Sequence, residues 1–190
     1  MGLNPVNEKN HSVEENKLGE NETMPKFLQQ LEKWVHRFNN ALHYVSAIIL
    51  FLLMFITVGD VFGRFALNNP ITGTYELTGL ALALIIFFSL GRTQMVKEHI
   101  DIDFFMKKVS LKTQQIIHLC IALFLFIFMI LVTWQLYEFA MRTMLGKELS
   151  GDLGISLHIF IFLTTIGAIA FTLTFLTDFF RLLFKVVNNR

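Results

Sequence analysis

The chain has 190 residues, of which 54% are hydrophobic and 21 are phenylalanine, and its formal net charge is +1. This composition leaves little room for a water-soluble domain, and a near-neutral charge without a basic, aromatic patch argues against nucleic-acid binding. The single cysteine, Cys120, excludes a disulfide framework within one chain.

Residues 1–23 are polar and rich in Glu, Asn and Lys. They contain no apolar stretch of the kind found in a secretory signal peptide. We therefore expect a flexible polar arm that precedes the membrane-associated part of the chain.

Residues 24–40 are predicted to form an amphipathic helix that lies in the membrane interface. Thr23 can cap its start, and Pro25 suits its first turn. Apolar side chains recur at helical spacing, and the cations between them would meet anionic headgroups. The interfacial face contains Phe27, Leu31, Trp34 and Phe38. The alternative is that this segment simply extends the first membrane-spanning helix.

Four long runs without a charged residue or a proline make up most of the remaining chain. They predict an all-α integral membrane protein, because a spanning helix needs about 20 mostly apolar residues. Residues 41–185 would form a four-helix membrane domain and residues 186–190 a cytoplasmic tail. The predicted spans are about 41–63, 73–91, 115–137 and 153–177.

Basic residues predict the orientation. Eleven Lys and Arg residues flank the spans on the side of the two termini and the middle loop, whereas the other two loops carry only Arg64, Arg142 and Lys147. The positive-inside rule assigns the richer side to the cytoplasm, so we expect both termini there.

The predicted spans lack the features of a transport or catalytic site. No Asp, Glu, Lys or Arg lies near a span centre, and the prolines, Pro5, Pro25 and Pro70, lie outside the spans. Transporters of polar solutes usually place ionisable groups or broken helices at the membrane midplane. We therefore expect no catalytic, substrate-binding or metal-binding residue in this chain, and no cofactor.

Small residues in two spans have the spacing of helix-packing contacts. In the second span they are Gly79 and Ala83, and in the fourth they are Thr164, Gly167, Ala168 and Thr172.

Charged residues gather at the ends of the first two spans. Asp60 and Arg64 are one helical turn apart, in the order that favours an ion pair. After a turn at Pro70, Glu76 falls in the first turn of the next helix, where the helix dipole favours a carboxylate. The second run is short, so Glu76 must lie near an interface or be paired inside the protein. Two interpretations stay open: separate charges that reach the interface, or a clamp in which Arg64 meets Glu76.

Two groups of residues raise the question of haem or metal. His43 and His118 begin the first and third spans and share one half of the bilayer, as two axial haem ligands would. An acidic segment of the middle loop has no second cluster to complete a metal site, so a solvated loop explains it better. This segment contains Glu98, His99, Asp101 and Asp103.

The ordered residues at the span ends resemble the small membrane subunit of tripartite ATP-independent periplasmic (TRAP) transporters. The resemblance covers about residues 26–185 and rests on order and spacing rather than on one motif. It runs through Asp60-Val-Phe-Gly-Arg64-Phe65, Asn69-Pro70-Ile71, Tyr75-Glu76-Leu77, Gly91-Arg92 and Glu98-His99-Ile100-Asp101-Ile102-Asp103. The family-motif residues carried over are Asp60, Arg64, Pro70, Glu76, Gly91, His99 and Asp103.

The resemblance implies a bacterial inner-membrane protein that works with a large permease subunit and a periplasmic substrate-binding protein. Such transporters use sodium to take up organic acids, including C4-dicarboxylates and sialic acids, and the large subunit holds the substrate and sodium sites. The small subunit would be a non-catalytic scaffold surrounded by lipid. The runner-up hypothesis is a haem-binding membrane anchor of a dehydrogenase, with His43 and His118 as ligands. A third is an exporter of hydrophobic cations, for which Glu76 lies too near a helix end.

Overall fold

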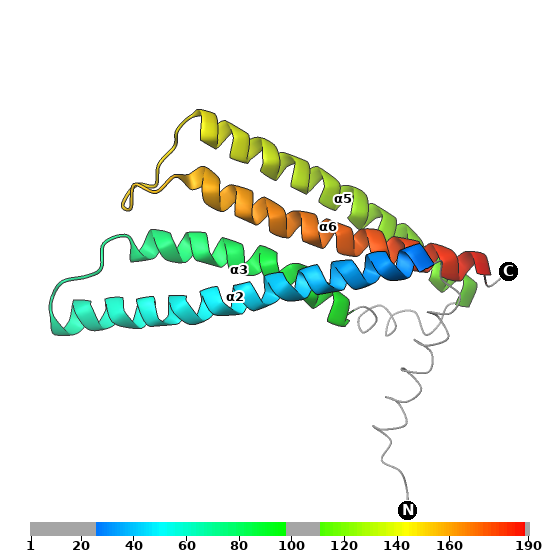
Figure 1. Cartoon of the computed structure of the whole chain (residues 1–190), viewed down its shortest axis with the longest axis horizontal. Helices are drawn as coiled ribbons and strands as arrows, with labels where there is room; N and C mark the ends of the chain where they lie inside the picture. Colours follow the sequence, from blue (N-terminus) through cyan, green and yellow to red (C-terminus); the bar gives the residue numbers. More distant parts are fainter. Residues whose placement is uncertain (1–25, 98–110, 189–190) are drawn as a thin grey trace, which may run out of the picture.

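The computed structural model describes residues 26–97 and 111–188, which form four long helices (Figure 1). They are α2 (Lys26–Ala66), α3 (Thr74–Lys97), α5 (Leu111–Leu145) and α6 (Leu157–Asn188). Each contains a stretch long and apolar enough to cross a membrane, which confirms the prediction of a helical protein with four spans. The predicted polar arm of residues 1–23 lies outside the described residues.

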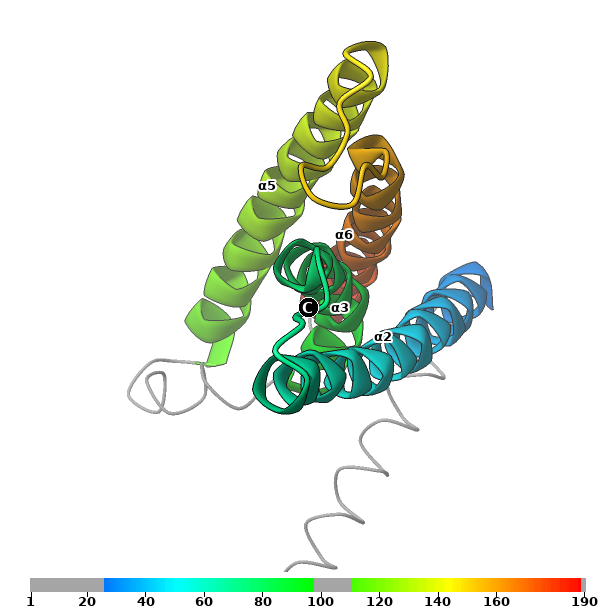
Figure 2. The ribbon, with the colours of Figure 1, turned by 90° about the vertical axis from the view of Figure 1, so that its left-hand side faces the viewer.

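The helices form two hairpins, α2 with α3 and α5 with α6, which meet along α3 and α6. α2 also contacts α6. The start of α2 and the end of α6 lie at one end of the molecule, here called the terminal end (Figure 1). The α2–α3 and α5–α6 loops lie at the opposite end, here called the loop end. Figure 2, seen from the loop end, places α3 and α6 between α2 and α5.

α2 runs without a break through residue 40, where the sequence suggested a boundary. The structure therefore shows one helix where a separate interfacial helix over residues 24–40 was predicted. No proline or glycine interrupts residues 26–58. Asn39 does not cap a new helix, because its Nδ2 donates a hydrogen bond of 3.0 Å to the carbonyl oxygen of Val35 in the preceding turn. The 41 residues of α2 extend over about 61 Å, twice a bilayer core of about 30 Å.

At the loop end the helices do not stop and start at the limits of the predicted spans. α5 continues to Leu145, beyond the predicted span limit of about residue 137, and α6 begins at Leu157, inside the predicted span of about 153–177. Residues 150–155 form a tight turn instead, in which Gly154 has a positive φ of 62°.

Small residues allow α3 and α6 to pack closely. A Cβ on Gly167 would lie 2.9 Å from the carbonyl oxygen of Phe87, so the two backbones nearly touch. Thr164 and Ala168 of α6 are also buried, in agreement with the packing row predicted there. The row predicted on α3 does not hold for Gly79, which is exposed and would have nothing within 4 Å of an added Cβ.

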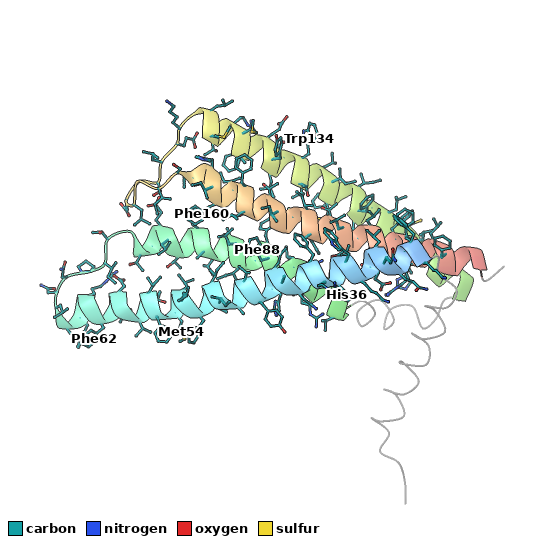
Figure 3. The ribbon with its side chains drawn as sticks, in the orientation of Figure 1. His36, Met54, Phe62, Phe88, Trp134 and Phe160 are labelled. Carbon is teal, nitrogen blue, oxygen red and sulfur yellow. The ribbon has the colours of Figure 1, made fainter. Side chains whose placement is uncertain are left out.

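α2 contributes only a narrow strip to the packed interior. Its buried residues Asn39, Ser46, Leu53 and Asp60 recur every seven positions, as in helices that pack at a shallow angle. Figure 3 shows Met54 and Phe62 pointing away from the other helices. The other large exposed side chains of α2 include Ile48, Phe51, Phe55 and Val58. Such a surface suits lipid or another membrane protein.

Candidate functional site

Asp60 lies buried near the end of α2 and binds two partners there, a group here called the Asp60 site. Its Oδ2 accepts a hydrogen bond of 2.7 Å from Nη2 of Arg64, one helical turn later. Its Oδ1 accepts the backbone N–H of Ile71 at 2.9 Å. A buried carboxylate needs such charged or N–H donors to offset its lost hydration. The Asp60 site therefore fixes the α2–α3 loop to the last turns of α2.

The loop folds back on α2 because its residues favour a tight turn. Asn68 has a positive φ of 48°, which asparagine tolerates better than most residues. The backbone N–H groups of Leu67 and Asn69 both donate to the carbonyl oxygen of Gly63, each at 3.1 Å. Pro70 follows, exposed, and suits a position without a backbone donor.

Glu76 connects the two hairpins. Its Oε1 accepts the backbone N–H of Gly151 at 2.9 Å, and its Oε2 accepts those of Asp152 at 3.0 Å and Leu153 at 3.3 Å. This group is here called the Glu76 site. A carboxylate that accepts three backbone donors forms strong, charge-assisted hydrogen bonds. The first turn of α3 is thereby attached to the α5–α6 loop.

Of the two interpretations that the sequence left open, the clamp between Arg64 and Glu76 is wrong, because each group has a different main partner. Arg64 bonds to Asp60 on its own helix, and its side chain is 67% exposed. Glu76 bonds to the backbone of the α5–α6 loop. The Glu76 site thus joins the α2–α3 hairpin to the α5–α6 hairpin. It does not hold the two helices of the first hairpin to each other.

Gly73 and Leu153 complete the contact beside Glu76. A Cβ on Gly73 would lie 2.4 Å from Cδ2 of Leu153, so the leucine occupies the space that a side chain would need. Gly73 also has a positive φ of 81°, which strains other residues. Sequence reasoning missed Leu153, because nothing in the residue types shows that this loop reaches α3.

At the terminal end, Asn39 of α2 lies between α3 and α6. It is 1% exposed, and its Nδ2 donates to Oγ1 of Thr174 at 3.1 Å as well as to its own helix. Its Oδ1 lies 1.8 Å from the place where Gly91 would carry a Cβ. Within the described residues this Oδ1 has no hydrogen-bond partner. Gly91, Asn39 and Thr174 form what is here called the Asn39 site, in which three helices meet.

Of the remaining predicted site residues, His99 and Asp103 lie outside the described residues. The aromatic residues predicted for the interfacial face lie at the start of α2. Phe27 and Trp34 are exposed, and the ring of Trp34 stacks on that of Phe38 with centroids 5.6 Å apart. Leu31 is half-buried.

The structure does not bring together the two histidines considered as haem ligands. His43 lies exposed on α2, and His118 lies on α5. The main contacts of these helices are with α3 and α6, which lie between them (Figure 2). Among residues 26–97 and 111–188, no group of three or more His, Cys, Asp or Glu residues is arranged to hold a metal ion.

The sequence matches one protein family over most of its length. The model of the DctQ component of tripartite ATP-independent periplasmic transporters matches residues 53–185. The chain belongs to this family. The matched residues include the Asp60 and Glu76 sites and Gly91, whereas Asn39 and the first half of α2 precede them. Searches of curated proteins and of solved structures found no match.

Membership of the DctQ family makes the chain a small permease subunit of a TRAP transporter. Transporters of this kind are tripartite, so a large permease subunit and a binding protein are its partners. The family consists of transporter components rather than enzymes, and it gives no support to a haem-binding dehydrogenase anchor.

Proposed function

We propose that this DctQ-family subunit is a non-catalytic scaffold for the large permease subunit of a sodium-driven importer of organic acids. The observation that carries this proposal is where the polar groups lie. Among the described residues, the one buried ionised side chain is Asp60, at a helix end. Transport sites for charged solutes need polar groups at midplane depth that are free to bind the solute.

Several hydroxyl groups inside the spans form hydrogen bonds within the helix bundle. Oγ1 of Thr133 donates to the carbonyl oxygen of Met129 at 2.8 Å, and Thr164 does the same to Phe160 at 2.8 Å. Thr133 also shares a hydrogen bond of 3.0 Å with Thr172 of α6. The bond between Thr133 and Thr172 joins α5 to α6, and the bonds within each helix leave these hydroxyl groups less available to a substrate, which supports a structural role.

The exposed outer face of α2 supports the same proposal. A 41-residue helix that buries only a narrow strip offers a long apolar surface to a neighbour in the membrane. Rigid attachment at the Glu76 and Asn39 sites would keep this surface in one orientation. A large subunit that moves during transport would gain a fixed support and a wider footprint in the bilayer.

The transported acid belongs to the C4-dicarboxylate or sialic-acid type in this proposal. The substrate and sodium ions would bind in the large subunit, in a bacterial inner membrane. The loop end would face the periplasm, where the binding protein docks.

Reconstitution with and without this chain tests the scaffold role. The large subunit is placed in liposomes alone or together with this chain, and sodium-driven uptake from the loaded binding protein is measured. We expect transport to depend on this chain. Full transport by the large subunit alone would contradict the proposal.

A second arm of the experiment separates scaffolding from substrate binding. Variants of the Glu76 and Asn39 sites should lower the amount of large subunit that co-purifies, while the substrate concentration for half-maximal uptake stays constant. Gly79→Ala is the matched control, because a Cβ there would contact nothing. A changed substrate affinity with normal assembly would indicate instead that this chain takes part in substrate binding.

A further inference from the structure

The first part of α2 carries three pairs of a cation followed at once by an aromatic residue. The pairs are Lys26–Phe27, Lys33–Trp34 and Arg37–Phe38. They are separated by seven and then four residues, which is the spacing of one helix face. The cations therefore form one strip along α2, and the aromatic rings form a second strip beside it.

The cation strip lies on the side of α2 that faces away from α6, and the aromatic strip is exposed at Phe27 and Trp34 and half-buried at Phe38. All three cations are exposed, and Phe27 and Trp34 are 73% and 58% exposed. The opposite side of the same turns is packed, because Val35 and Asn39 are each 1% exposed.

The acidic residue within this segment does not neutralise the cation strip. Glu32 lies on the packed side, where it forms an ion pair with Arg181 of α6. Among the described residues, no acidic side chain forms an ion pair with the three cations, so the outer face keeps its positive charge there. The Glu32–Arg181 pair fixes the helix so that the two strips point outward.

The length of α2 places the part of this face nearest residue 38 at the level of the lipid headgroups. From Asp60, a hydrocarbon core of about 30 Å takes up about 20 residues and ends near residue 40. The turns that carry Trp34 and Arg37 follow directly beyond that boundary. Tryptophan side chains favour this interfacial layer, and Lys and Arg reach from it to phosphate groups.

We infer that the exposed face of residues 33–38 binds the headgroups of anionic phospholipids, with the ring of Trp34 in the interface and Lys33 and Arg37 against the lipid phosphates. A single phosphate can meet two cations that are one helical turn apart, such as Lys33 and Arg37. Bound lipid would hold α2 at a fixed depth at the end opposite the Glu76 site. This role concerns residues that precede the family match and is independent of the scaffold function.

The two tryptophans of the chain provide the test. Trp34 lies in the proposed lipid site, and Trp134 lies on α5 with 66% of its side chain exposed. The full-length chain is reconstituted as Trp134→Phe or Trp34→Phe, so that one tryptophan remains. Quenching is then measured in bilayers that contain brominated phosphatidylglycerol or brominated phosphatidylcholine at equal mole fraction. The ratio of the two quenching curves gives the relative affinity for the anionic lipid.

We expect Trp34 to report a preference of roughly fivefold or more for phosphatidylglycerol, since each cation near a headgroup layer is worth about a factor of five. The preference should fall to about one in Lys33→Gln/Arg37→Gln, and Arg142→Gln at the loop end should leave it unchanged. Trp134 should show no preference in any variant. Circular dichroism checks that each variant keeps its helices.

Three results would overturn the inference. Equal quenching of Trp34 by both lipids would mean that the face meets the bilayer without recognising charge. A preference that survives loss of Lys33 and Arg37 would place the lipid site elsewhere. Quenching of Trp34 by aqueous iodide and not by either lipid would show that this part of α2 stands in water.

Discussion

Asn39 can pack against α3 because Gly91 has no side chain at the contact. We predict that Gly91→Ala destabilises the chain by about 1–3 kcal/mol, the usual range for overpacking, since the new methyl would occupy the position of Asn39 Oδ1. Thermal unfolding in detergent measures the change.

Two further variants show whether that contact is the cause. The double variant Gly91→Ala/Asn39→Ala lacks the clash. Asn39→Ala should therefore destabilise the Gly91→Ala chain less than it destabilises the unchanged chain. Gly79→Ala adds the same methyl group to the same helix in open space, and we expect no loss there. Equal destabilisation by both glycine substitutions would contradict the role assigned to Asn39.

Glu76 holds the α5–α6 loop through backbone N–H groups, so loss of its carboxylate should release that loop. We predict that Glu76→Ala lowers the thermal stability of the chain, because three backbone donors lose a charged acceptor. Trypsin should then cut faster after Lys147, which is exposed next to the loop. Glu148→Ala removes an exposed acid from the same loop and serves as the control.

Arg64 provides the contrast at the same end of the molecule. Its ion pair with Asp60 is mostly exposed on the arginine side, and exposed pairs contribute only about 0–1 kcal/mol. Arg64→Ala should therefore leave tryptic cleavage at Lys147 unchanged. If both substitutions released the loop equally, Arg64 and Glu76 would act as one clamp, which is one of the two interpretations that the sequence left open.

The sequence was enough to select Asp60, Glu76 and Gly91 and to pair Asp60 with Arg64, but not to find the partners of Glu76 and Gly91. A charge or a glycine at a span end is visible as a departure from an apolar run. The donors to Glu76 are backbone N–H groups some 75 residues later, and backbone groups leave no mark on residue type. Asn39 was overlooked because a polar residue near a span end is ordinary unless its neighbours on other helices are known.

At the scale of elements, the four apolar runs predicted the helices, whereas their ends depended on tertiary contacts. The change from charged to apolar sequence near residue 40 suggested two helices. The packing of Val35 and Asn39 and the Glu32–Arg181 pair continue α2 along the other helices instead. Local amphipathicity cannot reveal a contact with α6, which lies far away in sequence.

The continuity of α2 can be measured as a distance. Spin labels at Phe27→Cys and Phe62→Cys, in a Cys120→Ser background in lipid nanodiscs, should lie about 50 Å apart if the helix is straight. A helix that turns into the membrane plane at residue 40 would bring them to about 40 Å. The pair Val45→Cys and Phe62→Cys is the control, because about 25 Å is expected in both cases. A distance of about 40 Å for the first pair would support the separate interfacial helix predicted from the sequence.

At the scale of the whole molecule, polar contacts at the two ends attach the helices of an apolar bundle to one another. The Asp60 and Glu76 sites lie toward the loop end, and the Asn39 site and the Glu32–Arg181 pair lie toward the terminal end. Between them the helices meet through small residues such as Gly167. Because both ends of α3 are attached to other helices, the two hairpins should move as one body, as a scaffold requires.

The orientation of this body decides which partner each end can meet. Lys and Arg are concentrated at the terminal end and the middle loop, so the terminal end should face the cytoplasm. In a Cys120→Ser background, a membrane-impermeant maleimide should label Lys147→Cys in intact inner-membrane spheroplasts and Lys33→Cys only after permeabilisation. The reverse pattern would place the loop end in the cytoplasm, where a periplasmic binding protein cannot reach it. Labelling of both positions from the same side would contradict the hairpin arrangement itself, because the two residues lie at opposite ends of the bundle.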